Sequence, residues 1–404
     1  AHENKLVCYY ASTHPHQRTN GAFLIGAWQV LYLQRTPEEA YETVEAFDLM
    51  PFHDATPNKT CTFKLDVLDC LRGLAKAHEF DFFRFSPGDD LSQSSLFDLA
   101  EYEHFEAVEN GDLNWIVDNK VFAFAGPHDA NTLQPDGYRT LSPEDLAPYF
   151  ARKKVTLVVR LNKPYYDATT FTATGADFAD LYYLDGTNPP RRILKKFISI
   201  AEKTKGAIGV HCKAGLGRTG TCIGAFLMKH FKFTAEEIIG WMRICRPGMV
   251  IGQQQHFLKD MEDILWREGD AYRAAKGEPP ITRDDVYPPR RVNNNNNNNA
   301  PTTRRNSMPA GSSGTRRPSR SNSYDKRSSS FSAPNDNYDV IDDDDESKGD
   351  AKNDGDDNGL ASKMRALGLD QQQRDTTHRN NPRNSTQGDE LRRRRHQAVR
   401  NARL

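Results

Sequence analysis

Residues 207–220 read Ala-Ile-Gly-Val-His-Cys-Lys-Ala-Gly-Leu-Gly-Arg-Thr-Gly. The first four residues suit a buried strand, and the small residues around Arg218 suit the start of a helix. A strand that leads through a glycine-rich loop into a helix is a unit of α/β folds, which bind ligands at the carboxyl ends of their strands. The stretch therefore predicts an α/β fold with a ligand-binding loop at this point.

The chemistry of this loop follows from the residues that bound it and the glycines within it. Gly215, Gly217 and Gly220 let backbone amides turn inward around a tetrahedral dianion, and the helix that follows adds positive potential. Arg218 can close the ring with two hydrogen bonds to phosphate oxygens. The same amides stabilise a thiolate, which makes Cys212 a nucleophile at neutral pH. The loop therefore predicts chemistry on a phosphate group.

The other loop residues are expected to surround the phosphate or to orient the loop. We expect His211 to orient the loop through backbone bonds, and Thr219 to donate to the sulfur and ease its departure. A structural cysteine in a glycine-rich turn is the alternative. The GxGxxG pattern at 215–220 also fits a dinucleotide loop, but no acidic residue ends a strand about 20 residues further on. The predicted phosphate-binding residues are His211, Lys213, Ala214, Gly215, Leu216, Gly217 and Thr219.

Displacement of an oxygen from phosphorus requires a proton donor, expected on a loop ahead of the nucleophile. Asp185 follows an apolar run and precedes glycine and proline residues that suit a hinged loop. We predict that Asp185 is the general acid; the alternative is a turn aspartate that serves only Gly186. Gln254 and Gln255 are predicted to position the water that hydrolyses a phosphocysteine, the alternative being that they cap a helix.

Other apolar runs and caps predict the remaining elements. Strands are expected at 121–125, 155–159, 181–184 and 207–210, and helices at 192–203, 219–231, 235–245 and 254–266. Two stretches resemble each other, around Gly26-Ala27 and Gly224-Ala225. Each continues into a Thr-x-x-Glu capping box, at 36–39 and 234–237. The similarity predicts two related domains.

Composition excludes several classes of protein. The chain has 404 residues, with Lys+Arg 54 against Asp+Glu 55, which disfavours a strongly basic nucleic-acid binder. No run of about 18 apolar residues occurs, so we expect no membrane-spanning helix. No His/Cys cluster has the spacing of metal ligands, so we expect neither a metal nor a cofactor.

The composition changes near residue 289. An asparagine run at 293–299 is followed by Ser/Arg-rich stretches, an acidic run at 342–346 and an arginine run at 392–395. Large apolar side chains are too few there to offset chain entropy, so residues 276–404 are predicted to be a disordered tail. The spacing of Leu360, Met364, Leu367 and Leu369 is that of a nuclear export signal, and the arginine run is that of an import patch. Nuclear transport receptors are the implied partners, and chance spacing is the alternative.

Several motifs together resemble the cell-division-cycle-fourteen phosphatases, within the protein tyrosine and dual-specificity phosphatase superfamily. These motifs are Glu101-Tyr-Glu-His-Phe-Glu106, Arg160-Leu-Asn-Lys163, Asp185-Gly-Thr187, the loop at 211–220 and Arg246-Pro-Gly248. The resemblance implies two tandem dual-specificity-phosphatase-like domains, each a central sheet flanked by helices. The expected division is an N-terminal domain over 1–95, a linker helix over 96–118, a catalytic domain over 119–275 and the tail over 276–404. The N-terminal domain lacks a catalytic cysteine, and its first elements are expected to be missing.

The resemblance also implies an activity and a setting. It implies a metal-free protein phosphatase of dual specificity that acts through a phosphocysteine on phosphoserine-proline sites made by cyclin-dependent kinases. By position, Cys212 matches the nucleophile, Arg218 the phosphate clamp, Asp185 the general acid and the two glutamines the water-positioning pair. Gln253 stands where the family usually has proline, which leaves the register of the glutamines open. The implied setting is mitotic exit and cytokinesis, in the nucleus and cytoplasm, with nucleolus, spindle and centrosome as further candidate sites. A non-catalytic phosphoprotein-binding scaffold is the alternative.

Substrate selection is expected at the acidic, helix-like stretch between the two halves. Glu103 and Glu106 are three residues apart and share a helix face, and Phe105 offers an apolar surface to a proline. Kinase sites of the implied type carry Lys or Arg a few residues after the proline, which the two carboxylates would attract. A solvated acidic helix is the alternative.

Overall fold

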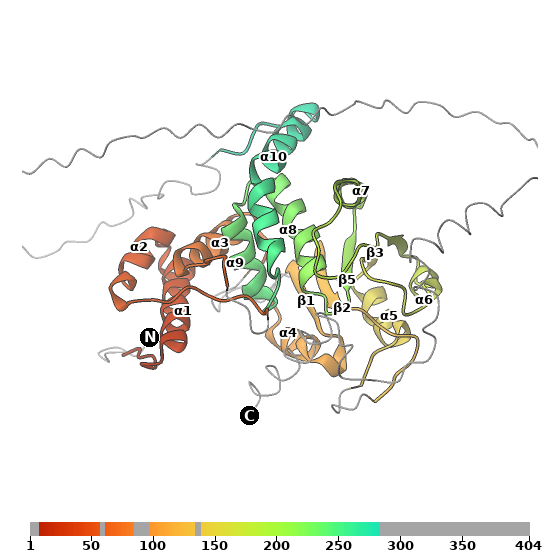
Figure 1. The fold of residues 1–404 in the computed structure, drawn as a ribbon, viewed down its shortest axis with the longest axis horizontal. Helices are drawn as coiled ribbons and strands as arrows, with labels where there is room; N and C mark the ends of the chain where they lie inside the picture. The colour runs from red at the N-terminus through yellow and green to blue at the C-terminus, as the bar shows by residue number, and fades with distance from the viewer. Residues whose placement is uncertain (1–7, 57–60, 85–96, 134–138, 283–404) are drawn as a thin grey trace, which may run out of the picture. The chain divides into compact units, whose positions relative to one another are not determined.

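The structure is a computed structural model that describes residues 8–56, 61–84, 97–133 and 139–282 (Figure 1). We refer to 8–84 as the N-terminal half and to 97–282 as the C-terminal half. The expected export signal, the import patch and the predicted tail from residue 283 onward lie outside the described residues. Within those residues, no helix is both long enough and apolar enough to cross a membrane.

A five-stranded sheet forms the centre of the C-terminal half. Its strands lie in the order β1-β2-β5-β3-β4, with β1 antiparallel to β2 and the other pairs parallel. Every residue of the central strand β5 is buried, and β5 ends at Cys212. The loop around Cys212 therefore follows the carboxyl end of the central strand, where α/β sheets bind ligands. The strands are β1 (Leu113–Val117), β2 (Val121–Ala125), β3 (Val155–Arg160), β4 (Asp177–Asp180) and β5 (Ala207–Cys212).

Helices cover both faces of this sheet (Figure 1). Alternate strand residues face opposite sides, so Phe122 and Phe124 pack with α5 and α6, whereas Val121 and Ala123 pack with α7 to α10. The α/β architecture predicted from the sequence, a central sheet flanked by helices, is thereby confirmed for the C-terminal half. The helices are α5 (Pro143–Arg152), α6 (Thr169–Ala173), α7 (Arg191–Lys203), α8 (Gly217–Phe231), α9 (Ala235–Cys245) and α10 (Gln253–Ala275).

The N-terminal half consists of helices and loops where it is described, with one isolated bridge between Phe52 and Leu65. Its helices are α1 (Pro15–Leu33), α2 (Pro37–Glu42), a 3-10 turn (Glu45–Phe47) and α3 (Val67–Glu79). Both predicted capping boxes are present, one at the start of α2 and the other at the start of α9.

The two halves share one hydrophobic cluster. α3 packs against α9, and Leu74 of α3 belongs to the same buried cluster as Ile238 of α9. Across this contact, the buried Lys76 Nζ lies 2.7 Å from Glu237 Oε2 and donates to the carbonyl of Lys232 at 2.8 Å. The N-terminal half is thus joined to the C-terminal half by a continuous core.

The linker helix is shorter than the sequence predicted. α4 spans Leu99–Glu106, followed by a 3-10 turn at Val108–Asn110 and then by β1. The end of the expected helix is the edge strand of the sheet instead, because a turn with Asn119 at φ 55° folds β1 back onto β2. An asparagine turn between two apolar runs is the signal that predicts such a hairpin.

The strand predicted at 181–184 was also wrong, since β4 lies at Asp177–Asp180. β4 is an edge strand with partly exposed side chains, so it carries no apolar run. Leu181 and Tyr183 follow β4 and are buried in the core. The Tyr183 hydroxyl donates to the carbonyl of Arg218, in the first turn of α8, at 3.1 Å. A smaller difference concerns a helix end: the last helix was predicted to end at residue 266, and α10 continues to Ala275.

Candidate active site

Cys212, at the end of β5, is only 3% exposed, and the loop from it to α8 is closely packed. Gly215 adopts φ +64°, and a Cβ there would lie 2.1 Å from the carbonyl oxygen of Phe124. A Cβ on Gly217 would lie 2.6 Å from Gln254 Oε1. Any larger residue at either position would displace its neighbours, so the shape of the loop depends on these two glycines.

Arg246 holds the outer side of this loop, and the predictions of site residues did not include it. Peptide groups that turn their amides towards a bound anion turn their carbonyls away, and buried carbonyls need donors. Arg246 is fully buried; its Nε donates to the carbonyl of Gly215 and its Nη2 to that of Ala214, both at 2.9 Å. Its Nη1 lies 2.9 Å from Asp112 Oδ1 and 2.8 Å from Asn114 Oδ1. The loop is therefore anchored to the residues at the start of β1.

The structure brings Arg218 and Asp185 together beside the loop. Arg218 Nη1 donates to the carbonyls of Leu161 at 3.1 Å and Tyr183 at 2.9 Å, which fixes the guanidinium. Arg218 Nη2 lies 3.2 Å from Asp185 Oδ1, and the Asp185 side chain is 30% exposed. The amide of Gly186 also donates to Asp185 Oδ1, at 3.1 Å. Asp185 is thus in contact both with the Arg218 guanidinium and with solvent.

The His211 side chain contacts the backbone of Cys212. Its ring is fully buried, and burial lowers the pKa of His211 to about 3, so the imidazole is neutral near pH 7. Nδ1 lies 3.0 Å from the carbonyl oxygen of Cys212, which can only accept, so Nδ1 carries the proton. Nε2 therefore accepts from the hydroxyl of Tyr166 at 2.6 Å. Tyr166 belongs to the site through this bond, although no local sequence pattern marks it.

Gln254 and Gln255 have different surroundings. The side chain of Gln254 is buried, its Nε2 donates to the carbonyl of Thr187 at 3.0 Å, and its Oε1 has no hydrogen-bond partner among the described residues. Gln255 Nε2 donates to Asp54 Oδ2 at 2.9 Å, and its Oε1 accepts from Arg243 at 2.6 Å. Gln254 therefore faces the loop after Cys212 with an acceptor that has no partner among the described residues, whereas Gln255 joins the two halves.

The remaining predicted loop residues have less specific surroundings. Ala214 and Leu216 are buried, and Lys213 Nζ lies 6.0 Å from the centre of the Tyr165 ring. The expected bond from Thr219 to the Cys212 sulfur is not formed, because the buried Thr219 hydroxyl has no hydrogen-bond partner in the described part of the chain. Thr219 lies in the first turn of α8, which begins at Gly217.

The acidic residues predicted to select substrates lie on α4. Glu103 is exposed, and Glu106 Oε1 accepts from the hydroxyl of Tyr102 at 3.3 Å. Phe105 is half-buried, and its ring centre lies 4.0 Å from that of Tyr149, so the ring packs against α5.

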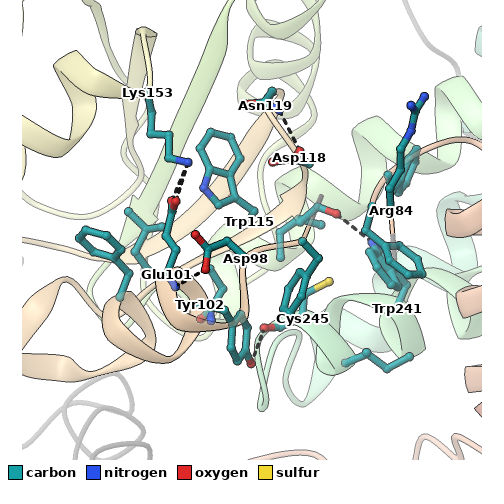
Figure 2. A pocket seen from close by; sticks show the side chains of 18 of the residues that line it. Arg84, Asp98, Glu101, Tyr102, Trp115, Asp118, Asn119, Lys153, Trp241 and Cys245 are labelled. Carbon is teal, nitrogen blue, oxygen red and sulfur yellow. Dashed lines mark hydrogen bonds and ion pairs between the residues drawn. The ribbon is translucent and has the colours of Figure 1, made fainter. Parts of the chain in front are cut away.

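A cavity of about 480 Å³ lies between α4, β1 and α9, and Figure 2 shows Glu101, Tyr102 and Trp115 at its wall. The described residues that line this cavity include none of the catalytic loop. Of the three α4 residues predicted to select substrates, Phe105 lines this cavity and Glu103 and Glu106 do not.

The described residues include no group of three or more His, Cys, Asp or Glu side chains that could hold a metal ion. The chemistry that this arrangement supports directly is attack by a buried thiol on a group bound by the loop amides and Arg218, with Asp185 as a neighbouring proton donor.

Comparison with known proteins connects this geometry with a family. Residues 1–77 match the family model described as the N-terminal half of dual specificity protein phosphatases, and residues 185–264 match the catalytic domain of dual specificity phosphatases. The chain is 47% identical over 285 residues to the dual specificity protein phosphatase CDC14A of Mus musculus, a match that covers 70% of this chain and 45% of that protein.

More distant relatives match the same part of the chain. It is 41% identical over 252 residues to the tyrosine-protein phosphatase cdc-14 of Caenorhabditis elegans, covering 62% of this chain and 34% of that protein. It is 38% identical over 265 residues to the tyrosine-protein phosphatase CDC14 homolog of Schizosaccharomyces pombe, covering 64% and 47%. The chain spans about half the length, or less, of the curated relatives it matches.

Proposed function

Because this chain is homologous to the CDC14 dual specificity phosphatases, we propose that it hydrolyses phosphate esters of proteins through a phosphocysteine on Cys212. The observation that carries the proposal is the convergence of three groups: the buried Cys212 at the end of β5, the fixed guanidinium of Arg218, and Asp185 3.2 Å from that guanidinium. These groups supply the nucleophile, the phosphate clamp and the acid of one displacement.

In the first step, the Cys212 thiolate attacks phosphorus while the loop amides and Arg218 bind the non-bridging oxygens. The bond from phosphorus to the substrate oxygen breaks, and Asp185 gives that oxygen its proton. The products are a dephosphorylated protein and a phosphocysteine. In the second step, water attacks the same phosphorus, Asp185 takes up the proton from that water, and inorganic phosphate leaves with regeneration of the thiolate.

We assign the water to Gln254 and not to Gln255. The Gln254 Oε1 atom is buried beside Gly217 without a partner among the described residues, so it can accept a hydrogen bond from water. Both polar atoms of the Gln255 side chain are already engaged, by Asp54 and Arg243.

Phosphate release from a phosphoserine-proline peptide tests this proposal. We expect release in the presence of a metal chelator, because every step uses side chains of the chain itself. Loss of activity on chelation would contradict the metal-free mechanism. Tight binding of the peptide without any turnover would favour the scaffold interpretation.

We further propose that the substrates are phosphoserine-proline sites of cyclin-dependent kinases with a nearby basic residue, in cell-cycle control. The exposed Glu103 and its neighbour Glu106 are the side chains we assign to that basic residue. Because Phe105 is packed against Tyr149, we expect it to hold α4 in place.

Reversal of both charges, Glu103→Lys with Glu106→Lys, should lower kcat/KM for a basic phosphopeptide about tenfold, or by 1 to 2 kcal/mol, through repulsion. Hydrolysis of a small aryl phosphate should be unchanged. The matched control is Glu42→Lys with Glu45→Lys, two exposed glutamates of the N-terminal half with the same spacing. Equal losses on both substrates, or no loss on either, would place the basic residue elsewhere.

Shuttling between nucleus and cytoplasm is a further proposal, which depends on the motifs at 360–369 and 392–395. A fluorescent reporter fused to residues 300–404 should change compartment when either motif is mutated. A reporter that ignores both mutations would contradict it.

A further inference from the structure

α7 carries a one-sided basic surface directly after the loop that holds Asp185. Five cations occupy its solvent side, and all five are exposed. With 3.6 residues per turn they fall within one sector of about 140°, opposite the residues that α7 buries in the core. We call this set the α7 basic face: Arg191, Arg192, Lys195, Lys196 and Lys203.

The cations of the α7 basic face stay more than 4 Å from any carboxylate in the described part of the chain, although Lys195 lines a hollow that Glu202 and Glu268 also line. None of its side chains forms an ion pair there; the pairs found in the C-terminal half involve other cations. The acidic residue of α7 itself, Glu202, is 2.8 Å from Lys229 Nζ and 3.0 Å from His230 Nε2, so its charge is already compensated.

This arrangement works against the stability of the helix. Arg191 and Lys195, like Arg192 and Lys196, are four residues apart, where like charges repel each other. Arg191 and Arg192 also lie in the first turn, which contains no acidic residue and where the helix dipole disfavours positive charge. Features that break such local rules are expected mainly at functional sites, where a ligand compensates for them.

The position of the face indicates which ligand would reach it. α7 begins six residues after Asp185, a separation that spans at most about 20 Å. The intervening loop is held by the bond from Gln254 Nε2 to the carbonyl of Thr187. The first turn of α7 therefore lies within the reach of a substrate segment that extends about six residues from a phosphoserine bound beside Asp185. The five cations of the α7 basic face complement negative charge, and the set includes no aromatic side chain for stacking with nucleic-acid bases.

We propose that the α7 basic face binds an acidic or phosphorylated segment of the protein substrate, removed along its chain from the phosphoserine that is hydrolysed. This inference rests on the proposed function and adds a substrate class to it. Substrates with an acidic cluster near the phosphorylated site would be preferred over singly phosphorylated ones, through a contact that depends on ionic strength.

Two phosphoserine-proline peptides test the proposal. The glutamate peptide carries four glutamates about six to ten residues from the phosphoserine, and the plain peptide lacks them. This spacing matches the distance of up to about 20 Å between Asp185 and the start of α7. For the wild-type chain at low salt, we expect kcat/KM of the glutamate peptide to exceed that of the plain peptide about tenfold. The variant Arg192→Gln with Lys196→Gln should reduce this ratio to about twofold or less, and salt near 0.5 M should do the same to the wild type.

The matched control is Arg84→Gln with Lys64→Gln, which removes one exposed arginine and one exposed lysine of the N-terminal half and should keep the tenfold ratio. The α7 variant should melt no lower than the wild type, because a repulsion is removed. An unchanged ratio in the α7 variant, or an equal fall in the control, would overturn the proposal.

A binding measurement separates this inference from the proposed function. Fluorescence anisotropy of an unphosphorylated peptide with the same glutamates reports the face without catalysis, while an aryl phosphate reports the active site. Binding to the wild type that is lost in the α7 variant supports the inference, even if no substrate is hydrolysed. If a single-stranded oligonucleotide binds more tightly than the acidic peptide, the face is a nucleic-acid site and the proposal fails.

Discussion

Replacement of Cys212 by serine should abolish turnover and leave phosphopeptide binding intact. The serine hydroxyl is not ionised near neutral pH, so the nucleophile of the first step is lost. We expect kcat to fall at least about a thousandfold, which corresponds to roughly 4 kcal/mol of transition-state stabilisation. Single-turnover phosphate release measures this loss directly.

Binding to the same variant should persist because the loop amides, Arg218 and Arg246 are unchanged, and Arg246 still donates to the carbonyls of Ala214 and Gly215. Anisotropy of a labelled phosphopeptide gives the dissociation constant. Cys8→Ser, at an exposed cysteine, is the matched control and should keep wild-type rates. Turnover by Cys212→Ser within a few-fold of the wild type would rule out the proposed nucleophile.

Replacement of Asp185 by asparagine should slow hydrolysis of a phosphoserine peptide far more than hydrolysis of an activated aryl phosphate. A serine oxygen leaves as an alcohol and needs a proton, which asparagine cannot supply, and general acid catalysis is worth about 100- to 10,000-fold. An activated phenol leaves without a proton. We therefore expect a loss of at least about a hundredfold in kcat on the peptide and only a small loss on the aryl phosphate.

Two comparisons make this result specific. Asp177→Asn changes an exposed carboxylate at the start of β4 and should leave both rates unchanged. A loss of equal size on the two substrates of Asp185→Asn would mean that Asp185 acts by holding Arg218, 3.2 Å away, and the acid would have to be sought elsewhere.

The catalytic loop could be predicted from the sequence because its residues are contiguous. Cys212 and Arg218 bound a single turn, so their spacing alone implies that both can reach one anion. Arg246 and Tyr166 could not be found in this way, because each acts through contacts with residues remote in the sequence. Their roles become visible only when the strands and helices are assembled.

The fold shows the same limit at its edges. β5 is buried on both faces and was predicted from its apolar run, whereas β4 at the sheet edge is half-exposed and was placed too late in the sequence. β1 fell within the linker helix that the family resemblance implied for residues 96–118. Gln254 and Gln255 could not be distinguished, because their different directions depend on α10 beginning at Gln253.

The proposed mechanism passes through a covalent phosphoenzyme on Cys212, which can be trapped and located. The variant Gln254→Ala should slow the second step, because the acceptor assigned to the water is removed, and phosphocysteine should then accumulate. The variant is mixed with an aryl phosphate, quenched with acid and digested, and the phosphoryl group is located by mass spectrometry. We expect one phosphoryl group, on the peptide that contains Cys212, in an amount that rises and then decays with turnover. Continued release of phosphate with no phosphoryl group on any peptide, or with the group on another residue, would contradict it.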